Sequence, residues 1–290
     1  MLLLCHQLFP SMAISLLVTT DFSTNSKAGI RFAIQLAAQG KYQLVFYHCL
    51  PYLKPTRWSD DQYEAYSRAE SQKTAAALRR FVLNVYRDAR MKAARFECVV
   101  ECRADIQQAI IDYAAQIGAA AICIGTRGAG RIRKMFGTNT SALIHRSPVP
   151  VFAVPKNYRR SAIKHILYAS DLNHLGPELK QVRNIARPFK ALITVVHYDY
   201  LADVKEVKEK LEKVAYEHRH RGVNFLFRKY NIDKPLGEHF RRDFRISKVS
   251  LAVLFTNQKR NWFDKLFLSS KSADVALDTK TPLLIIPRVN

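Results

Sequence analysis

The 290-residue sequence predicts two tandem α/β domains, each a doubly wound sheet of five parallel strands. Three observations predict this class. Residues 14–39 and 164–188 share one pattern, an apolar strand that ends in aspartate, then a polar turn and an amphipathic helix. Strand-like and helix-like segments then alternate through both halves. The strand segments are almost continuously apolar, which is typical of parallel strands buried on both faces, and right-handed crossovers complete a doubly wound sandwich.

The elements of the two halves follow in the same order. Asp21 and Asp171 close the first strand of each half, and an amphipathic helix follows each one. In the first half the further strands are expected at 42–50, 96–102, 120–125 and 147–155, with a long charged helix at 60–90. In the second half they are expected at 191–199, 224–230, 251–256 and 280–287, with a charged helix at 202–221. The domains are therefore expected at 13–157 and 162–290, joined by a linker at 156–164.

The charge of the chain favours anionic partners. Lys and Arg number 46 against 24 Asp and Glu, which gives a net charge of +22. This excess attracts polyanions and anionic ligands and says nothing about the fold. Basic and aromatic residues interleave at 228–231 and 260–265, a pattern that could follow a nucleic-acid backbone. No known base-reading motif accompanies it.

The cysteines and the N-terminus indicate a cytoplasmic protein. The five cysteines form no CxxC motif and have mostly apolar neighbours, which predicts reduced thiols in a reducing compartment. Cys98 and Cys102 would face the same side of one strand. Residues 1–11 resemble a dispensable extension before Met12 more than a signal peptide. No stretch approaches the length of a transmembrane helix, so no membrane partner is expected.

A glycine-rich segment at 125–141 follows the apolar run at 120–124. Gly125, Gly128 and Gly130 suit positive φ or close backbone approach to a ligand. Thr138 could cap a new helix whose free N–H groups would hold an anion such as a phosphate. An ordinary strand-to-helix turn is the alternative reading.

Three segments together resemble the universal stress protein family: "TTDFS" at 19–23, the glycine-rich segment at 125–141 and "SPVPVFAVP" at 147–155. The resemblance covers residues 13–290 as two such units and implies the adenine-nucleotide alpha-hydrolase-like fold. Members that carry Gly-x-x-Gly, nine residues and then Gly-Ser or Gly-Thr often bind ATP. The first half has only eight residues between Gly128 and Gly137. Either Gly130 absorbs this deletion, or the deletion misplaces the phosphate-binding amides.

The second half keeps the family spacing but has lost every glycine. Thr256, Lys259 and Ser269-Ser270 stand at the motif positions, with nine residues between Lys259 and Ser269. A lysine side chain where the backbone must approach a ligand predicts that this half binds no nucleotide. The resemblance therefore implies ATP, with Mg²⁺, as a ligand of the first half alone.

The resemblance also implies a set of nucleotide-binding residues. They are Thr19, Thr20, Asp21, Cys49, Gly125, Gly128, Gly137, Thr138 and Asn139. Asp21 would accept hydrogen bonds from the nucleoside, backbone groups at Cys49 would meet the adenine, and the other positions from 125 onward would wrap the ribose and phosphates. The alternative for Asp21 is a helix N-cap or a turn residue, because Asp171 recurs without a glycine loop behind it. Arg127, Arg131, Arg133 and Lys134 would add charge near the phosphates, or form a solvated face.

Three functions remain open on the sequence. The first is a stress-response regulator whose association with protein partners depends on nucleotide. The second is a ligand-free scaffold or dimer, because the terminal strands at 147–155 and 280–287 could pair across halves or molecules. The third is non-specific nucleic-acid binding. No catalytic motif and no metal-ligand spacing is present, so an enzyme is not expected.

Overall fold

The computed structural model describes residues 14–40, 42–51, 53–126, 138–199, 204–218, 222–229, 239–240, 242–243, 248–256 and 280–288. In the first half its elements are β1 (Ile14–Thr19), α1 (Ser26–Gln39), β2 (Tyr42–Leu50), α2 (Asp60–Asp88), β3 (Phe96–Cys102), α3 (Ile106–Gln116), β4 (Ala121–Thr126), α4 (Thr138–Arg146) and β5 (Val151–Pro155). In the second half they are β6 (His165–Ala169), α5 (Leu175–Ala186), the 3₁₀ helix η2 (Arg187–Phe189), β7 (Leu192–Asp199), α6 (Val204–Glu217), β8 (Val223–Lys229), β9 (Leu251–Thr256) and β10 (Leu283–Pro287).

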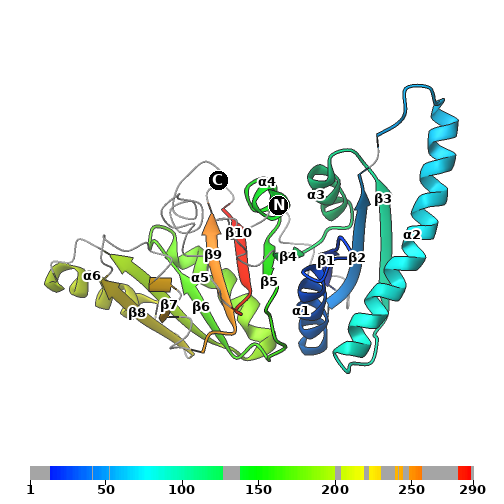
Figure 1. Cartoon of the computed structure of the whole chain (residues 1–290). Coiled ribbons are helices and arrows are strands. Elements are labelled where there is room, and N and C mark those ends of the chain that lie inside the picture. The colour runs from blue at the N-terminus through cyan, green and yellow to red at the C-terminus, as the bar shows by residue number, and fades with distance from the viewer. Residues whose placement is uncertain are drawn as a thin grey trace, which may run out of the picture.

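The predicted α/β class is confirmed, with one difference in how the two sheets meet. Each half arranges its five strands in the same order, β3-β2-β1-β4-β5 and β8-β7-β6-β9-β10, and all neighbours within a half are parallel. β5 and β10 then pair antiparallel, with Ala153 opposite Leu283. The two sheets are therefore one twisted ten-stranded sheet (Figure 1). The expectation that the terminal strands pair is confirmed in its intramolecular form.

The helices begin and end close to the predicted positions. α2 begins with a capping box, in which the Ser59 hydroxyl accepts from the Gln62 amide and the Gln62 side chain accepts from the Ser59 amide. Asp60 and Asp61 lie in its first turn, where their charge complements the helix dipole. α6 covers most of the predicted 202–221. The alternation of strands and helices also predicts a helix between the strands at 224–230 and 251–256. Most of that stretch lies outside the described residues, although 239–240 and 242–243 are helical.

Two apolar layers, one on each face of the sheet, form the core. Helices α1, α2 and α5 contribute buried side chains to one layer, together with Tyr158 and Ile163 of the linker. Helices α3 and α4 contribute to the other layer. Each layer contains residues of both halves, so the packing is continuous across the β5–β10 seam. This arrangement leaves the carboxyl ends of β1 and β4 free to form a site.

Candidate nucleotide site

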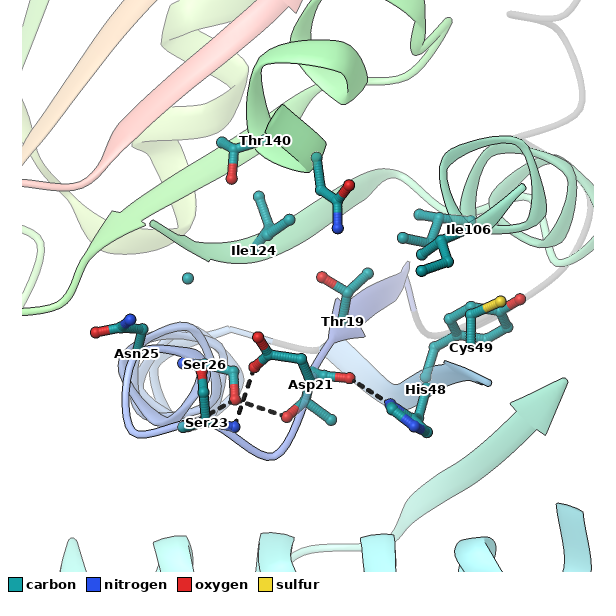
Figure 2. A pocket seen from close by; sticks show the side chains of 15 residues that line it. Thr19, Asp21, Ser23, Asn25, Ser26, His48, Cys49, Ile106, Ile124 and Thr140 are labelled. Atoms are coloured by element: carbon teal, nitrogen blue, oxygen red, sulfur yellow. Dashed lines mark hydrogen bonds between the residues drawn. The ribbon is translucent and has the colours of Figure 1, made fainter. Parts of the chain in front are cut away.

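A cleft opens at the carboxyl ends of β1, β2 and β4, where the strand order of the first half reverses. Crevices at such switch points are where open α/β sheets bind ligands. Figure 2 shows the side chains that line it. They are Thr19, Thr20, Asp21, Ser23, Asn25, Ser26, Tyr47, His48, Cys49, Ile106, Ile110, Ile124, Gly125, Asn139 and Thr140.

The loop after β1 is held by short-range hydrogen bonds. The Ser23 amide donates to the Asp21 carboxylate at 3.0 Å, and the hydroxyls of Thr20 and Ser26 lie 2.8 Å apart (Figure 2). Burial alone would raise the pKa of Asp21, but hydrogen bonds from Ser23 and Ser26 outweigh it and lower the pKa. Asp21 is thus an ionised turn residue, because the N-cap position of α1 belongs to Asn25. Its side chain remains exposed at the mouth of the cleft.

The floor and one wall of the cleft are less polar. The His48 ring meets the Thr20 carbonyl through Nδ1 at 2.7 Å, which fixes the end of β1 to β2. Cys49 lies one residue further along β2, opposite Ile106 and Ile110 of α3. Burial raises the pKa of the Cys49 thiol to about 11, so it is an uncharged lining group. An apolar wall beside polar groups suits a flat heterocycle with a polar tail.

Gly125 has a structural reason to be glycine. A Cβ at this position would lie 2.4 Å from the Asn25 carbonyl oxygen, and a Cβ at Gly29 would lie 2.9 Å from the Gly125 amide nitrogen. The start of α1 therefore packs directly on the end of β4, backbone against backbone. One glycine of the motif is explained by this packing, whether or not a ligand binds.

The structure brings together most of the predicted site. Thr19, Thr20, Asp21, Cys49, Gly125 and Asn139 all line the one cleft. Thr138 begins α4, as expected for the helix that follows the loop. Gly128 and Gly137 lie outside the described residues, as do Gly130 and the four basic residues of the loop. The same holds for Lys259, Ser269 and Ser270.

Sequence reasoning missed several lining residues. They are Ser23, Asn25, Ser26, Tyr47, His48, Ile106, Ile110, Ile124 and Thr140. One signal was available for His48, because the second half places His197 at the same point of its second strand. The isoleucines of α3 carried no signal, since an apolar helix face predicts core packing rather than a cleft wall.

The second half repeats the scaffold of this loop. The Asn173 amide donates to Asp171 at 3.0 Å, as Ser23 does to Asp21. His197 meets the Ser170 carbonyl at 2.8 Å, and Leu172 has a positive φ of 66° as Phe22 has one of 61°. Features that both halves share therefore build the turn and need no ligand to explain them.

The two halves differ where a ligand would lie. Thr19 pairs with Tyr47 and Ala169 with Val196, so Tyr198 of the second half stands where Cys49 stands in the first. Gly118 and Lys248 both have a left-handed backbone and lie three residues before β4 and β9, so they are equivalent positions. Ile110 and Phe240 each lie eight residues before these positions, which makes Phe240 the counterpart of Ile110. The rings of Tyr198 and Phe240 lie 5.3 Å apart, and both are buried. Two aromatic side chains thus occupy the region that in the first half is the cleft wall.

A buried ionic cluster also covers the aspartate of the second half. Arg288 follows β10 and contacts the Asp171 carboxylate through Nη1 at 2.9 Å and the Glu178 carboxylate through Nε at 2.6 Å. The Tyr168 hydroxyl donates to Glu178 from the other side. In the first half the counterpart of Arg288 is Lys156, which is exposed. Asp171 is therefore satisfied within the chain, whereas Asp21 faces the cleft.

Metal-ligand clusters and membrane-spanning helices are both absent from the described part of the chain. No group of three or more His, Cys, Asp or Glu side chains there could hold a metal ion. Of the helices that the structure describes, none is both long and apolar enough to cross a membrane. Cys49, Cys98, Cys102 and Cys123 are all free thiols.

Comparisons with known proteins first define the class of fold. A universal stress protein from Archaeoglobus fulgidus DSM 4304 is 14% identical, has a TM-score of 0.65 and covers 96% of this chain and 100% of its own. A putative universal stress protein from Pseudomonas aeruginosa UCBPP-PA14 is 15% identical, has a TM-score of 0.56 and covers 94% of this chain and 92% of its own. Both likenesses show the fold of the whole chain.

The family follows from the sequence match. Residues 12–155 match the universal stress protein family. This first unit of the chain belongs to the family, and the length of the whole chain fits a tandem arrangement of two units. A universal stress protein from Archaeoglobus fulgidus in complex with dAMP is 20% identical, covers 49% of this chain and 98% of its own, and has a TM-score of 0.33; its ligand is a property of that protein. No curated protein matches the chain.

Proposed function

We propose that the chain is a stress-response regulatory protein that binds ATP in its first half and none in its second. Nucleotide occupancy would then change its association with protein partners. The observation that carries the proposal is the difference between two equivalent places in one chain. The first half has an open cleft with an ionised aspartate at its mouth, whereas the second fills the same region with its own side chains. We also propose 13–157 and 162–290 as the bounds of the two units.

The lining of the first cleft suits the parts of an adenine nucleotide. The base would lie between the end of β2 at Cys49 and the isoleucines of α3, where backbone groups can read its edge. The Asp21 carboxylate would accept hydrogen bonds from ribose hydroxyls. The phosphates would extend toward Gly125 and the start of α4, where free N–H groups and the helix dipole favour negative charge. Mg²⁺ would enter with the phosphates.

Titration calorimetry of ATP–Mg²⁺ binding to the full chain tests the proposal. The variant Cys49→Tyr copies the second half into the first and is expected to abolish binding by filling the cleft. Gly128→Lys copies Lys259 into the loop and is expected to do the same. The matched control Tyr198→Cys alters the second half alone and should leave affinity and stoichiometry unchanged.

The outcomes separate the candidate functions. A stoichiometry of one ATP per chain, with binding lost in the Cys49→Tyr variant, would support a nucleotide sensor. A flat trace from the unaltered chain would contradict it and favour the ligand-free scaffold. That second function rests on the β5–β10 seam, which makes the chain an internal pseudo-dimer. We also propose that the protein works in the reducing cytoplasm, which its free thiols support.

A further inference from the structure

Three exposed segments that are rich in basic residues meet around the linker between the two halves. They are residues 87–95 at the end of α2, the linker 156–164, and 187–190 at the end of α5, and we name them the linker band. They contain four, four and two Lys or Arg residues and a single acid, Asp88. All ten basic side chains are exposed.

Hydrogen bonds bring the three segments together. The Arg160 guanidinium donates to the Ala89 carbonyl at 3.4 Å, which ties the linker to the end of α2. The Ile163 amide donates to the Gln39 side chain at 3.3 Å, at the end of α1. The Leu192 amide donates to the Lys164 carbonyl at 2.9 Å, just beyond the end of η2. The band therefore runs from the first half to the second as one surface.

The basic side chains of the linker band differ from several cations elsewhere in the described chain, which are neutralised by ion pairs. Ion pairs occur beside the cleft and in the second half, as between Arg103 and Asp112, Arg146 and Asp105, and Arg288 and Asp171. Within the described residues no carboxylate lies within ion-pair distance of any basic side chain of the band. Ten like charges without counter-ions in the protein attract an external polyanion.

Two of these cations lie at left-handed backbone positions. Arg90 and Lys190 both have a φ of 52°, in turns that follow α2 and η2. Glycine is the usual residue at such left-handed positions, because a Cβ is strained there. The chain does use glycine in the equivalent turn after α3, at Gly118 with a φ of 57°. Glycine is therefore expected to be unstrained at Arg90 and Lys190.

We propose that the linker band is a docking surface for the phosphate backbone of double-helical nucleic acid. Six of its ten cations are arginines, whose forked guanidinium groups suit phosphate oxygens. α5 prolongs the band with Lys180 and Arg183, which share one exposed helix face with Arg187. A duplex carries about one charge per 1.7 Å of its axis, so a linear array of cations fits it without reading the bases. None of its residues lines the nucleotide cleft, so the two proposals can be tested separately.

The test measures binding of the full chain to a fluorescein-labelled 20-base-pair DNA duplex by anisotropy across a salt series. The variant Arg90→Gly with Lys190→Gly removes two cations at positions where glycine is unstrained, so the fold is retained. The control Arg57→Ala with Arg68→Ala removes two exposed cations that lie outside the band. Circular dichroism and thermal unfolding of all three proteins verify that they fold.

The expected result is specific to the band. Each lost phosphate contact should reduce the slope of log K against log salt by about 0.9, so the glycine variant should lose nearly two units and bind at least about tenfold more weakly at 0.1 M salt. The control should match the unaltered chain. Equal losses in both variants, or no duplex binding at all, would overturn the proposal. Binding to phosphatidylserine vesicles but not to the duplex would also overturn it and assign the band to a membrane surface.

Discussion

Removal of the Arg288 guanidinium tests whether the second half is closed by its own ionic cluster. The variant Arg288→Met keeps the length of the side chain and the backbone bond from the Arg288 amide to the Thr256 carbonyl. It leaves the carboxylate of Glu178, which is 4% exposed, with only the Tyr168 hydroxyl as a side-chain partner. It also frees Asp171, which is 22% exposed and can recover part of its hydration.

These exposures set the expected magnitude. Breaking a buried ion pair by removing one partner costs about 3–5 kcal/mol, because it strands the other charge. Partial access of water to Asp171 and the remaining Tyr168 bond place this case near the lower limit. We expect the free energy of unfolding in urea at pH 7 to fall by about 3 kcal/mol. Adding Glu178→Gln removes the stranded charge, so the double variant should be more stable than Arg288→Met alone.

The dependence on pH gives an independent check. Burial would raise the pKa of Asp171, but the hydrogen bonds from Arg288 and the Asn173 amide outweigh it and lower the pKa. A carboxyl group with a lowered folded pKa stabilises the fold above its unfolded pKa of about 4. That contribution is lost as the pH falls through the folded pKa. The stability gap between the unaltered chain and Arg288→Met should therefore narrow below about pH 4. A gap under about 1 kcal/mol at pH 7, or one that stays constant to pH 3, would refute the reasoning.

Three further predictions concern the first half. Gly125→Ala should lower the unfolding free energy by about 1–3 kcal/mol without nucleotide present, because its Cβ would meet the Asn25 carbonyl, and an unchanged melting temperature would contradict this. Ser59→Ala should lower the unfolding free energy by about 1 kcal/mol, because it removes the capping box of α2. Hydrogen exchange should then be faster for the amides of the first turn of α2, and unchanged exchange there would count against the cap. The thiol of Cys49, with a pKa of about 11, should react with iodoacetamide roughly tenfold faster per pH unit from pH 7 to 10, and a plateau near pH 8 would disprove its protonated state.

Local pattern accounts for much of this molecule. The expected strands at 42–50, 96–102 and 251–256 occur with the same bounds, and α2 begins at the predicted residue. These elements follow from apolar periodicity and from caps, which act over a few residues along the chain. The repeat itself predicted that the two halves share one strand order, since equal patterns of connection give equal topologies.

The candidate site was only partly predictable. Asp21 and Cys49 were predicted from the resemblance to the family, and they meet in the cleft because the carboxyl ends of parallel strands converge at one edge of the sheet. The isoleucine wall from α3 was missed, because nothing in a helix pattern tells which apolar residues remain at a cleft. Gly125 was interpreted as a ligand-binding residue, and the structure adds a packing reason that lies about a hundred residues away, at Asn25.

The sequence by itself thus determined the elements, their order and the two-fold repeat, because those depend on neighbours along the chain. Only the tertiary structure decided that β5 and β10 join the halves in one sheet, since edge pairing depends on which strands remain uncovered. It also decided how the second half is closed. Tyr198, Phe240 and Arg288 come from three distant segments, and their meeting at one point depends on strand register and long-range packing that no local pattern encodes.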